Sequence, residues 1–249
     1  MHALRVEHEG QLLRVTLARP ERRNAFDAEL IAELTEAFSG VPDGVRAVVL
    51  AGDGPSFCAG ADVEWQRASI DLTLEENVED ALRLHAMMAA VDGCPAPLVA
   101  RVQGYALGGG SGLVACADVV VAAPDATFGF SEVRLGIIPA VISPFVFARI
   151  GAGAARRLFV TGERFDADTA LRVGLVDEVA EDVDAAVEQQ VAAILRSGPA
   201  ATRAAKRLTR DRPTGARELA QIAAGLRAGP EGQEGLRAFL EKRRPNWSG

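Results

Sequence analysis

The chain has 249 residues, of which 49% are hydrophobic and 24% charged, as expected of a globular protein that can bury a substantial core. A formal net charge of −7 argues against a nucleic-acid-binding groove, and no apolar run approaches the roughly 20 residues of a membrane-spanning helix. Three cysteines without a CxxC pair argue against a disulfide framework or a zinc site, and the N-terminus lacks the features of a signal or transit peptide. We therefore expect a cytoplasmic protein that binds no metal, no nucleic acid and no membrane.

The first third of the chain alternates between strand and helix patterns. Residues 5–17 alternate in polarity around Gly10 and predict a β-hairpin. Asp27 is placed to cap a helix whose apolar residues recur at helical spacing up to Phe38. Residues 46–52 form a short apolar run typical of a buried strand, and it ends in the glycine-rich turn GDGPSFCAGAD. Residues 63–78 are polar and weakly periodic and predict a mobile loop, and residues 76–93 predict a helix.

The middle of the chain contains a glycine run followed by further strand patterns. A strand is expected near residues 98–104, then Gly108, Gly109 and Gly110, and then a short helix to residue 117. Residues 118–123 and 126–130 predict two more strands. After Pro139 a series of Ala/Leu/Arg-rich helices continues to the end, interrupted by the segment GLVDEV. The pattern predicts an α/β core over residues 1–190 and a helical region over 191–249.

Two glycine-rich turns are the first candidates for a site. CAGAD ends at Asp62, and LGGGSG spans Leu107 to Gly112. Taken alone, the first is an ordinary small-residue turn and the second is typical of tight helix–sheet packing. Neither is a dinucleotide-binding fingerprint or a P-loop. Together, two turns that each follow a strand favour a pair of backbone N–H groups meeting at one oxygen, which is an oxyanion hole.

Glu132 is the candidate proton carrier. It lies between apolar residues in FGFSEVRLGIIP. In that setting it is either the polar face of an edge strand or a partly buried carboxylate whose raised pKa suits proton transfer near neutral pH. The histidines are weaker candidates, because His2 and His8 lie near the terminus and His85 lies on a predicted helix.

The motifs CAGAD, GYALGGGSGLVACADVVVAA, FGFSEVRLGIIP and FLEKRRPNW, together with RPERRNAFD near the start, resemble the crotonase family of enoyl-CoA hydratases and isomerases in order along nearly the whole chain. The resemblance implies a ββα spiral with a helical C-terminal region, a homotrimer or dimer of trimers, and an acyl-CoA thioester as ligand with no separate cofactor. It implies that Ala61 and Gly109 donate the two N–H groups and that Glu132 is the acid–base. The ligand-binding positions that it implies are Arg23, Ala25, Ala59, Ala61, Asp62, Val63, Glu64, Gly108, Gly109, Arg134, Phe239 and Lys242.

The chain departs from the family pattern at one position. Many family hydratases carry a further glutamate three residues after the middle glycine of the triplet, where this chain has Gly112. Family isomerases keep only the later glutamate. The sequence nevertheless looks most like a bacterial subgroup that hydrates methylglutaconyl-CoA and related branched enoyl-CoAs. We therefore expect a hydratase in which Gly112 leaves room for a branched or carboxylated acyl group.

A carboxylated substrate would need a basic partner. Arg134 lies two residues after Glu132, and in an extended segment both side chains would point to the same side. Pairing of Arg134 with a surface acid such as Asp125 is an equally good interpretation.

Three other functions remain open at this point. An enoyl-CoA isomerase would need Glu132 alone, and a CoA-binding scaffold would need no acid–base at all. The retention of Glu132 together with both N–H donors favours an enzyme. RNA binding, known for some relatives, is disfavoured by the acidic charge.

Overall fold

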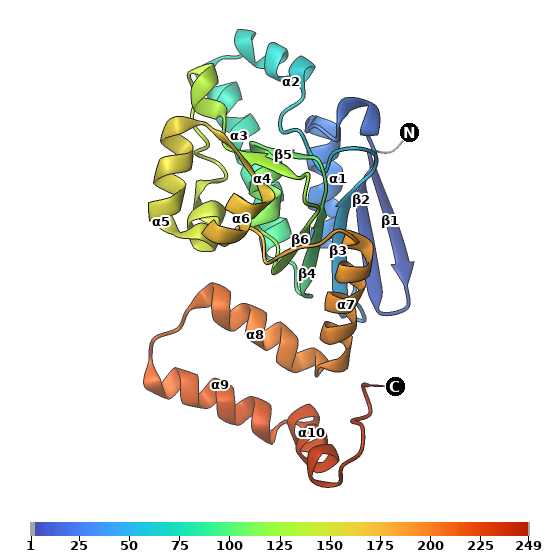
Figure 1. Cartoon of the computed structure of the whole chain (residues 1–249). Coiled ribbons are helices and arrows are strands. Elements are labelled where there is room, and N and C mark those ends of the chain that lie inside the picture. Colours follow the sequence, from blue (N-terminus) through green and yellow to red (C-terminus); the bar gives the residue numbers. More distant parts are fainter. Residues whose placement is uncertain (1–2, 249) are drawn as a thin grey trace.

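The computed structural model describes residues 3–248. Its main sheet contains β1 (Leu4–Glu9), β2 (Leu12–Leu17), β3 (Ala47–Gly52), β4 (Leu98–Val102), β6 (Val119–Ala122) and β9 (Glu178–Val179), in the spatial order β1-β2-β3-β4-β6-β9. β1 pairs with β2 in antiparallel fashion, which confirms the predicted hairpin, and the other neighbours are parallel. Figure 1 shows the helices packed around this sheet.

A second, three-stranded sheet lies beside the first. β5 (Tyr105–Leu107) pairs in parallel with β7 (Thr127–Gly129), which pairs antiparallel with β8 (Arg164–Asp166). The central residue of each strand is buried, and the rings of Phe128 and Phe165 stack at a centroid distance of 5.8 Å. Because side chains alternate along a strand, the flanking residues of all three strands share the opposite face.

The helices connect and cover the strands. They are α1 (Ala28–Ser39), α2 (Val63–Ala68), α3 (Leu74–Asp92), α4 (Gly109–Ala115), α5 (Ser143–Thr161), α6 (Ala167–Val173), α7 (Val183–Arg196), α8 (Pro199–Asp211), α9 (Ala216–Ala228) and α10 (Pro230–Leu240), with short 3-10 helices η1 (Pro20–Arg22), η2 (Ser69–Asp71) and η3 (Glu132–Leu135). The cap predicted at Asp27 is confirmed, because its side chain accepts a hydrogen bond from the N–H of Leu30.

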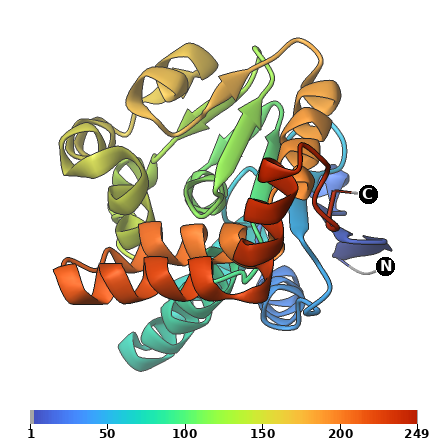
Figure 2. The ribbon, with the colours of Figure 1, turned by 90° about the horizontal axis from the view of Figure 1, so that it is seen from below.

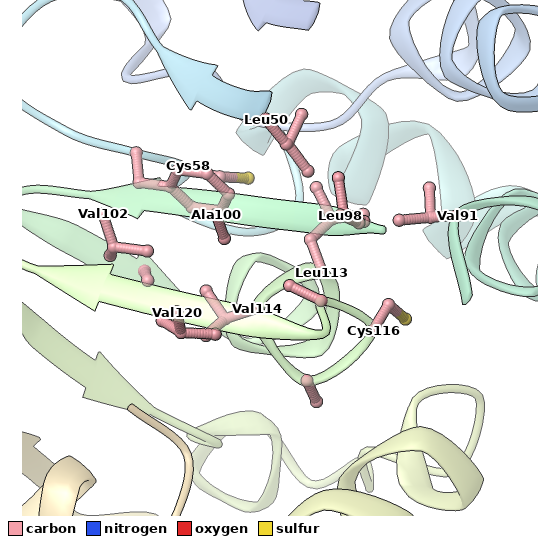
Figure 3. Packing of buried hydrophobic residues seen from close by; sticks show 14 of the residues in the cluster. Leu50, Cys58, Val91, Leu98, Ala100, Val102, Leu113, Val114, Cys116 and Val120 are labelled. Carbon is pink, nitrogen blue, oxygen red and sulfur yellow. The ribbon is translucent and has the colours of Figure 1, made fainter. Parts of the chain in front are cut away.

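The central strands β3, β4 and β6 of the main sheet are buried on both faces, and this explains their continuous apolar runs. On one face, side chains of β3, β4 and β6 pack against Leu113 and Val114 of α4 and Val91 of α3 (Figure 3). On the other face, α7 contributes Val187 and Val191 to a second apolar cluster. Residue 190, where we place the division between core and helical region, therefore lies within a helix that packs on the sheet.

Helices α8, α9 and α10 extend beyond the core at the lower end of the ribbon in Figure 1, and Figure 2 shows them crossing in front of it. A partly buried ion pair of 2.7 Å between Lys206 and Asp118 fastens α8 to the core. Arg46 donates to the carbonyls of Leu195, Ser197 and Trp247, which ties the end of the chain to β3. In contrast, α9 has no buried residue.

The loop predicted over residues 63–78 is wrong. Asp62 caps α2 by accepting from the N–H of Glu64, and η2 follows. Thr73 and Glu76 form a reciprocal capping box that starts α3 at Leu74. The polar residues that weaken the apolar periodicity of this segment are therefore the residues that begin its helices. The series of helices expected after Pro139 begins with α5, which is broken where Gly151 takes φ 73° and ψ 158°.

Candidate active site

The two glycine-rich turns meet as predicted, and the sheets position them. Cys58 bridges to Ala106 of β5, and Ala61 bridges to Phe26. Gly60 takes φ +92°, and a Cβ there would lie 2.8 Å from the carbonyl oxygen of Leu107. The close approach therefore requires a glycine.

The N–H groups of Ala61 and Gly109 remain available to a ligand. Gly60 accepts from Phe26 and Asp62 donates to Phe26, so the bridge uses the residues on both sides of Ala61 and not its own N–H. Gly108 takes φ 53° and ψ −120°, and α4 begins at Gly109. Within residues 3–248 neither N–H has a hydrogen-bond acceptor. A free N–H at the first residue of a helix also has the positive end of the helix dipole behind it.

These two turns border a cavity of about 460 Å³. Its walls come from α2, α3, β5, η3 and the segment leading into α5. Polar groups are few, and within the described residues the acidic ones are Glu132 and Asp80. The lining residues are Phe26, Ala59, Gly60, Ala61, Trp65, Gln66, Ser69, Asn77, Asp80, Ala81, Leu84, Leu107, Gly108, Gly109, Ser131, Glu132, Leu135, Ile137, Ile138, Pro139, Ala140, Val141, Ile142 and Arg164.

Glu132 enters this cavity from η3. A Cβ on Gly108 would lie 3.1 Å from its Oε1, so the carboxylate lies directly against the glycine turn. Its Oε2 is buried and, within the described residues, has no hydrogen-bond partner. Burial raises the pKa of Glu132, and one backbone hydrogen bond opposes this only in part. A partly buried carboxylate with one unpartnered oxygen that borders the two N–H donors is suited to transfer a proton to or from a bound ligand.

The space expected at Gly112 does not exist. This residue is fully buried in α4, and a Cβ on it would lie 2.7 Å from Cγ2 of Ile142, 3.0 Å from Cβ of Ile142 and 3.2 Å from Cε of Met88. The side chain of Ile142 therefore fills the place of a glutamate at position 112. The expectation that Gly112 leaves room for an acyl branch is wrong, because a residue 30 positions later closes that space.

Several positions that the resemblance implies lie at or near the rim of the cavity. The carbonyl of Arg23 accepts from the N–H of Ala59, which holds Arg23 and Ala25 beside the CAGAD turn. Asp62 is buried and pairs with Arg22 at 3.0 Å. Burial acts to raise the pKa of Asp62, but the hydrogen bonds from Arg22 and from backbone N–H groups outweigh it and the pKa lies below its usual value. Asp62 thus serves the structure of the turn.

Other predicted positions lie outside the cavity. Val63 is 67% exposed, and Glu64 pairs on the surface with Arg67. Phe239 is 78% exposed at the end of α10, and Lys242 follows it. Neither lines the cavity of this single chain, and in Figure 1 α10 lies at the opposite end of the molecule from α2.

Arg134 also lies outside. The extended segment expected around Glu132 is wrong, because η3 is a 3-10 turn that directs residues two apart to different sides. Arg134 is exposed, and its side chain packs near Gly162, where a Cβ would lie 3.3 Å from Cγ of Arg134. The arginine that lines the cavity is Arg164, from β8. The sequence interpretation missed Arg164, because its place depends on the pairing of β8 with β7.

Residues 7–249 match the family described as "Enoyl-CoA hydratase/isomerase". The chain belongs to this family. The cyclohexa-1,5-dienecarbonyl-CoA hydratase of Thauera aromatica is 34% identical over 97% of this chain and 95% of its own. The crystal structure of an enoyl-CoA hydratase from Shewanella pealeana superimposes with a TM-score of 0.92 at 37% identity, covering 99% of this chain and 96% of that chain. The solved structure of Pseudomonas aeruginosa AtuE superimposes with a TM-score of 0.95 at 37% identity, covering 99% of this chain and 100% of that chain.

The family match and these superpositions confirm the predicted fold class, the crotonase-like spiral with a helical C-terminal region. They also establish the chain as an enzyme of the enoyl-CoA hydratase/isomerase family. Over residues 3–248, no helix has both the length and the apolar character needed to cross a bilayer. The same residues contain no group of three or more His, Cys, Asp or Glu placed to hold a metal ion.

Proposed function

We propose that this enzyme adds water across the 2,3 double bond of an enoyl-CoA, with the thioester oxygen held by the N–H groups of Ala61 and Gly109. The observation that carries the proposal is the meeting of these two free N–H groups with the buried carboxylate of Glu132 in one cavity. The reaction needs no separate cofactor, because coenzyme A is part of the substrate.

The two N–H donors stabilise the charge that develops during the addition. When the oxygen of water bonds to C3, the π electrons move toward C2 and the thioester oxygen, which becomes an enolate. Donors fixed in advance at that oxygen lower the barrier, and one such donor typically contributes about 3–4 kcal/mol. Both donors are backbone groups held by strand bridges and by the start of α4, so they need no rearrangement.

Glu132 moves the proton in this proposal. Its carboxylate accepts a proton from the attacking water as the C3–O bond forms, and the resulting acid gives a proton to C2, which restores the thioester. A single carboxylate therefore closes the cycle, with one water consumed and the enzyme regenerated. The raised pKa of Glu132 suits the second step, because a carboxylate with a raised pKa takes up a proton readily and is then available as the acid that protonates C2.

For the substrate, we propose methylglutaconyl-CoA or a related branched enoyl-CoA, as the sequence resemblance implies. The walls formed by Leu84, Leu135 and Ile137 suit a branched apolar carbon chain. The similarity to the Thauera aromatica protein, which is named for the thioester of a cyclic diene, supports an acyl group other than a simple linear chain. Because Ile142 closes the space at Gly112, the acyl group must extend along the remaining walls.

Isomerisation is the second candidate, and a specific observation favours it. Ile142 occupies the place of the further glutamate, and one carboxylate is enough to move a double bond. Glu132 would take a proton from C2 of a 3-enoyl-CoA and return it to C4, through the same enolate at the same two N–H groups.

Turnover of a panel of 2-enoyl- and 3-enoyl-CoAs in H₂¹⁸O distinguishes the two reactions. Hydration places ¹⁸O in the 3-hydroxyacyl product, whereas isomerisation gives an unlabelled product with a shifted double bond. Glu132→Gln, assayed in parallel, should lose whichever activity is present. Absence of both reactions with every thioester would refute the proposal.

We also propose that the enzyme assembles as a trimer or as a dimer of trimers. What supports this is α9, which has no buried residue although Leu219, Ile222 and Leu226 follow helical spacing along it. In such an assembly Phe239 and Lys242 could approach the coenzyme A of a neighbouring subunit, although they lie away from the cavity of their own chain. Sedimentation equilibrium tests the assembly. A monomer at micromolar concentration would contradict it.

A further inference from the structure

One face of α3 forms a wall of the cavity. Four residues of this helix line it, at the i, i+3, i+4 and i+7 spacing of a single helix face, and they are Asn77, Asp80, Ala81 and Leu84. Met88 continues the same face one turn further, and its Cε would lie 3.7 Å from a Cβ at Gly109. The α3 wall therefore begins beside the proposed oxyanion donor and leads away from it toward the start of the helix.

Asp80 is the charged group on this wall. It comes eight residues before Met88, which corresponds to about 12 Å along the helix axis. Its carboxylate is therefore well separated from a thioester oxygen held at Gly109. It lies instead toward the far end of any acyl group that follows the α3 wall.

The carboxylate of Asp80 keeps one oxygen free. Its side chain is 16% exposed, and its Oδ1 accepts a hydrogen bond of 2.9 Å from Nη2 of Arg83. Within residues 3–248 its Oδ2 has no hydrogen-bond partner. The side chain of Arg83 is 62% exposed and does not line the cavity, so an acyl group in the cavity meets the carboxylate and not the guanidinium group. Surface ion pairs of this kind are weak.

The other charged groups of the cavity do not offset the charge of Asp80. Glu132 carries the same sign. Arg164 is the one cation among the described lining residues, but it belongs to β8 and lies over the ring of Tyr105 at 5.6 Å. No ion pair or hydrogen bond within residues 3–248 joins Arg164 to α3. Over the part of the chain that the structure describes, the α3 wall thus presents a carboxylate whose ion-pair partner lies on the surface.

We propose that Asp80 sets the acyl specificity of the enzyme by rejecting acyl groups that end in a carboxylate and admitting uncharged branched ones. The inference rests on the proposed function, which names methylglutaconyl-CoA or a related branched enoyl-CoA, and it favours the second kind. Ile142 closes the space at Gly112, so the acyl group follows the α3 wall and its far end approaches Asp80. A carboxylate brought there would lose water beside a like charge, whereas an uncharged end packs on Ala81 and Leu84.

Binding of saturated thioesters tests this selectivity without relying on turnover. Isovaleryl-CoA and 3-methylglutaryl-CoA are matched ligands, because they differ only in a terminal carboxylate. In calorimetric titrations we expect the parent to bind 3-methylglutaryl-CoA about tenfold or more weakly than isovaleryl-CoA. Asp80→Asn keeps the shape of the side chain and removes its charge, so it should remove most of this difference. Glu79→Gln is the control, because Glu79 is an exposed acid of α3 outside the cavity and its loss changes the net charge equally.

A double variant separates the charge of Asp80 from that of its partner. Asp80→Asn frees Arg83, which would itself attract a carboxylate, so the gain in affinity for 3-methylglutaryl-CoA should persist when Arg83→Gln is added. Loss of the gain in the double variant, or an equal gain in Glu79→Gln, would overturn the proposal.

Two further outcomes of the titrations decide the matter. Equal affinity of the parent for both ligands, or a difference that Asp80→Asn leaves unchanged, would also overturn the role of Asp80. If Asp80→Asn shifts the selectivity but no enoyl-CoA reacts, the proposed function fails and the specificity role of Asp80 stands.

Discussion

Replacing Gly112 by alanine measures how completely Ile142 closes the position of the further glutamate. Alanine in a helix interior is normally about 1 kcal/mol more favourable than glycine. At this position, however, the new methyl would lie 2.7 Å from Cγ2 and 3.0 Å from Cβ of Ile142. These atoms belong to a β-branched residue that cannot simply rotate away. Overpacking of a core costs about 1–3 kcal/mol, so we expect a net destabilisation of up to about 2 kcal/mol.

Gly225→Ala provides the matched control. Gly225 also lies within a helix, α9, but no atom lies within 4 Å of the position of its Cβ. This substitution should raise the free energy of unfolding by about 1 kcal/mol. Urea unfolding of both variants at one protein concentration should therefore move the midpoints in opposite directions. Equal stabilisation by the two substitutions would refute the conclusion that Ile142 fills the site.

A double substitution extends the same reasoning to catalysis. Gly112→Glu alone adds a buried carboxylate to an occupied space and should lower both stability and hydration. Ile142→Ala removes the Cγ2 atom that makes the shortest contact. In that background Gly112→Glu should be better tolerated, with a coupling energy of about 1–3 kcal/mol in a double-mutant cycle. Hydration of crotonyl-CoA by the double variant, compared with Ile142→Ala, then reports whether a second carboxylate adds to the rate. Additive effects on stability would show that positions 112 and 142 do not compete for space.

Substitutions at three further positions test the site. Glu132→Gln should lower turnover about 10²–10⁴-fold. Burial raises the pKa of Glu132 in the folded state, so the parent loses stability as the pH rises from below the ordinary pKa of 4.5 toward 8, and the Gln variant should gain stability relative to it, by about 1.4 kcal/mol for each pH unit by which the pKa is raised. A difference in unfolding free energy between variant and parent that is constant with pH would contradict this. Gly109→Pro should lower turnover about 10²–10³-fold, because proline has no N–H to donate. Gly109→Ala is its control: its Cβ would also lie 2.7 Å from Phe26, but it keeps the N–H, so it separates the loss of the donor from the steric effect. Arg134→Gln should leave the ratio of activities on methylglutaconyl-CoA and crotonyl-CoA unchanged, because Arg134 lies outside the cavity; a selective loss on the first would return the carboxylate partner to Arg134.

The order of the elements could be predicted because it depends on local patterns. The alternation before Leu17 and the cap at Asp27 each involve residues close in sequence, and the structure confirms both. The helix that begins at Val63 was missed, and the predicted helix over residues 76–93 was started two residues after its true start at Leu74, because the caps of these helices satisfy backbone N–H groups without adding to the apolar periodicity. A search of the sequence for capping residues, made before the search for apolar periodicity, would have found the starts of both helices.

The site could be predicted only where it is made of backbone. The glycines of each turn largely determine its backbone conformation, so two short motifs were enough to predict that Ala61 and Gly109 lie at the same cavity. The side chains that shape the cavity come from distant segments. Ile142 decides what fits at Gly112, and the pairing of β8 with β7 decides that Arg164, rather than Arg134, lines the wall. Spacing along one segment cannot show either contact.

The three-stranded sheet connects the parts of this site. Its strand β5 leads into the turn at Gly108, and the N–H of Gly108 donates to Gly129 of β7 at 2.8 Å. The same β7 leads into η3 and Glu132, while its other neighbour β8 presents Arg164. The proposed acid–base, one proposed oxyanion donor and the cavity-lining Arg164 therefore depend on a single small sheet, whose far face is held by the stacked rings of Phe128 and Phe165. Loss of that ring contact should disturb all three groups together, because no one of them can shift without moving the strand that positions the next.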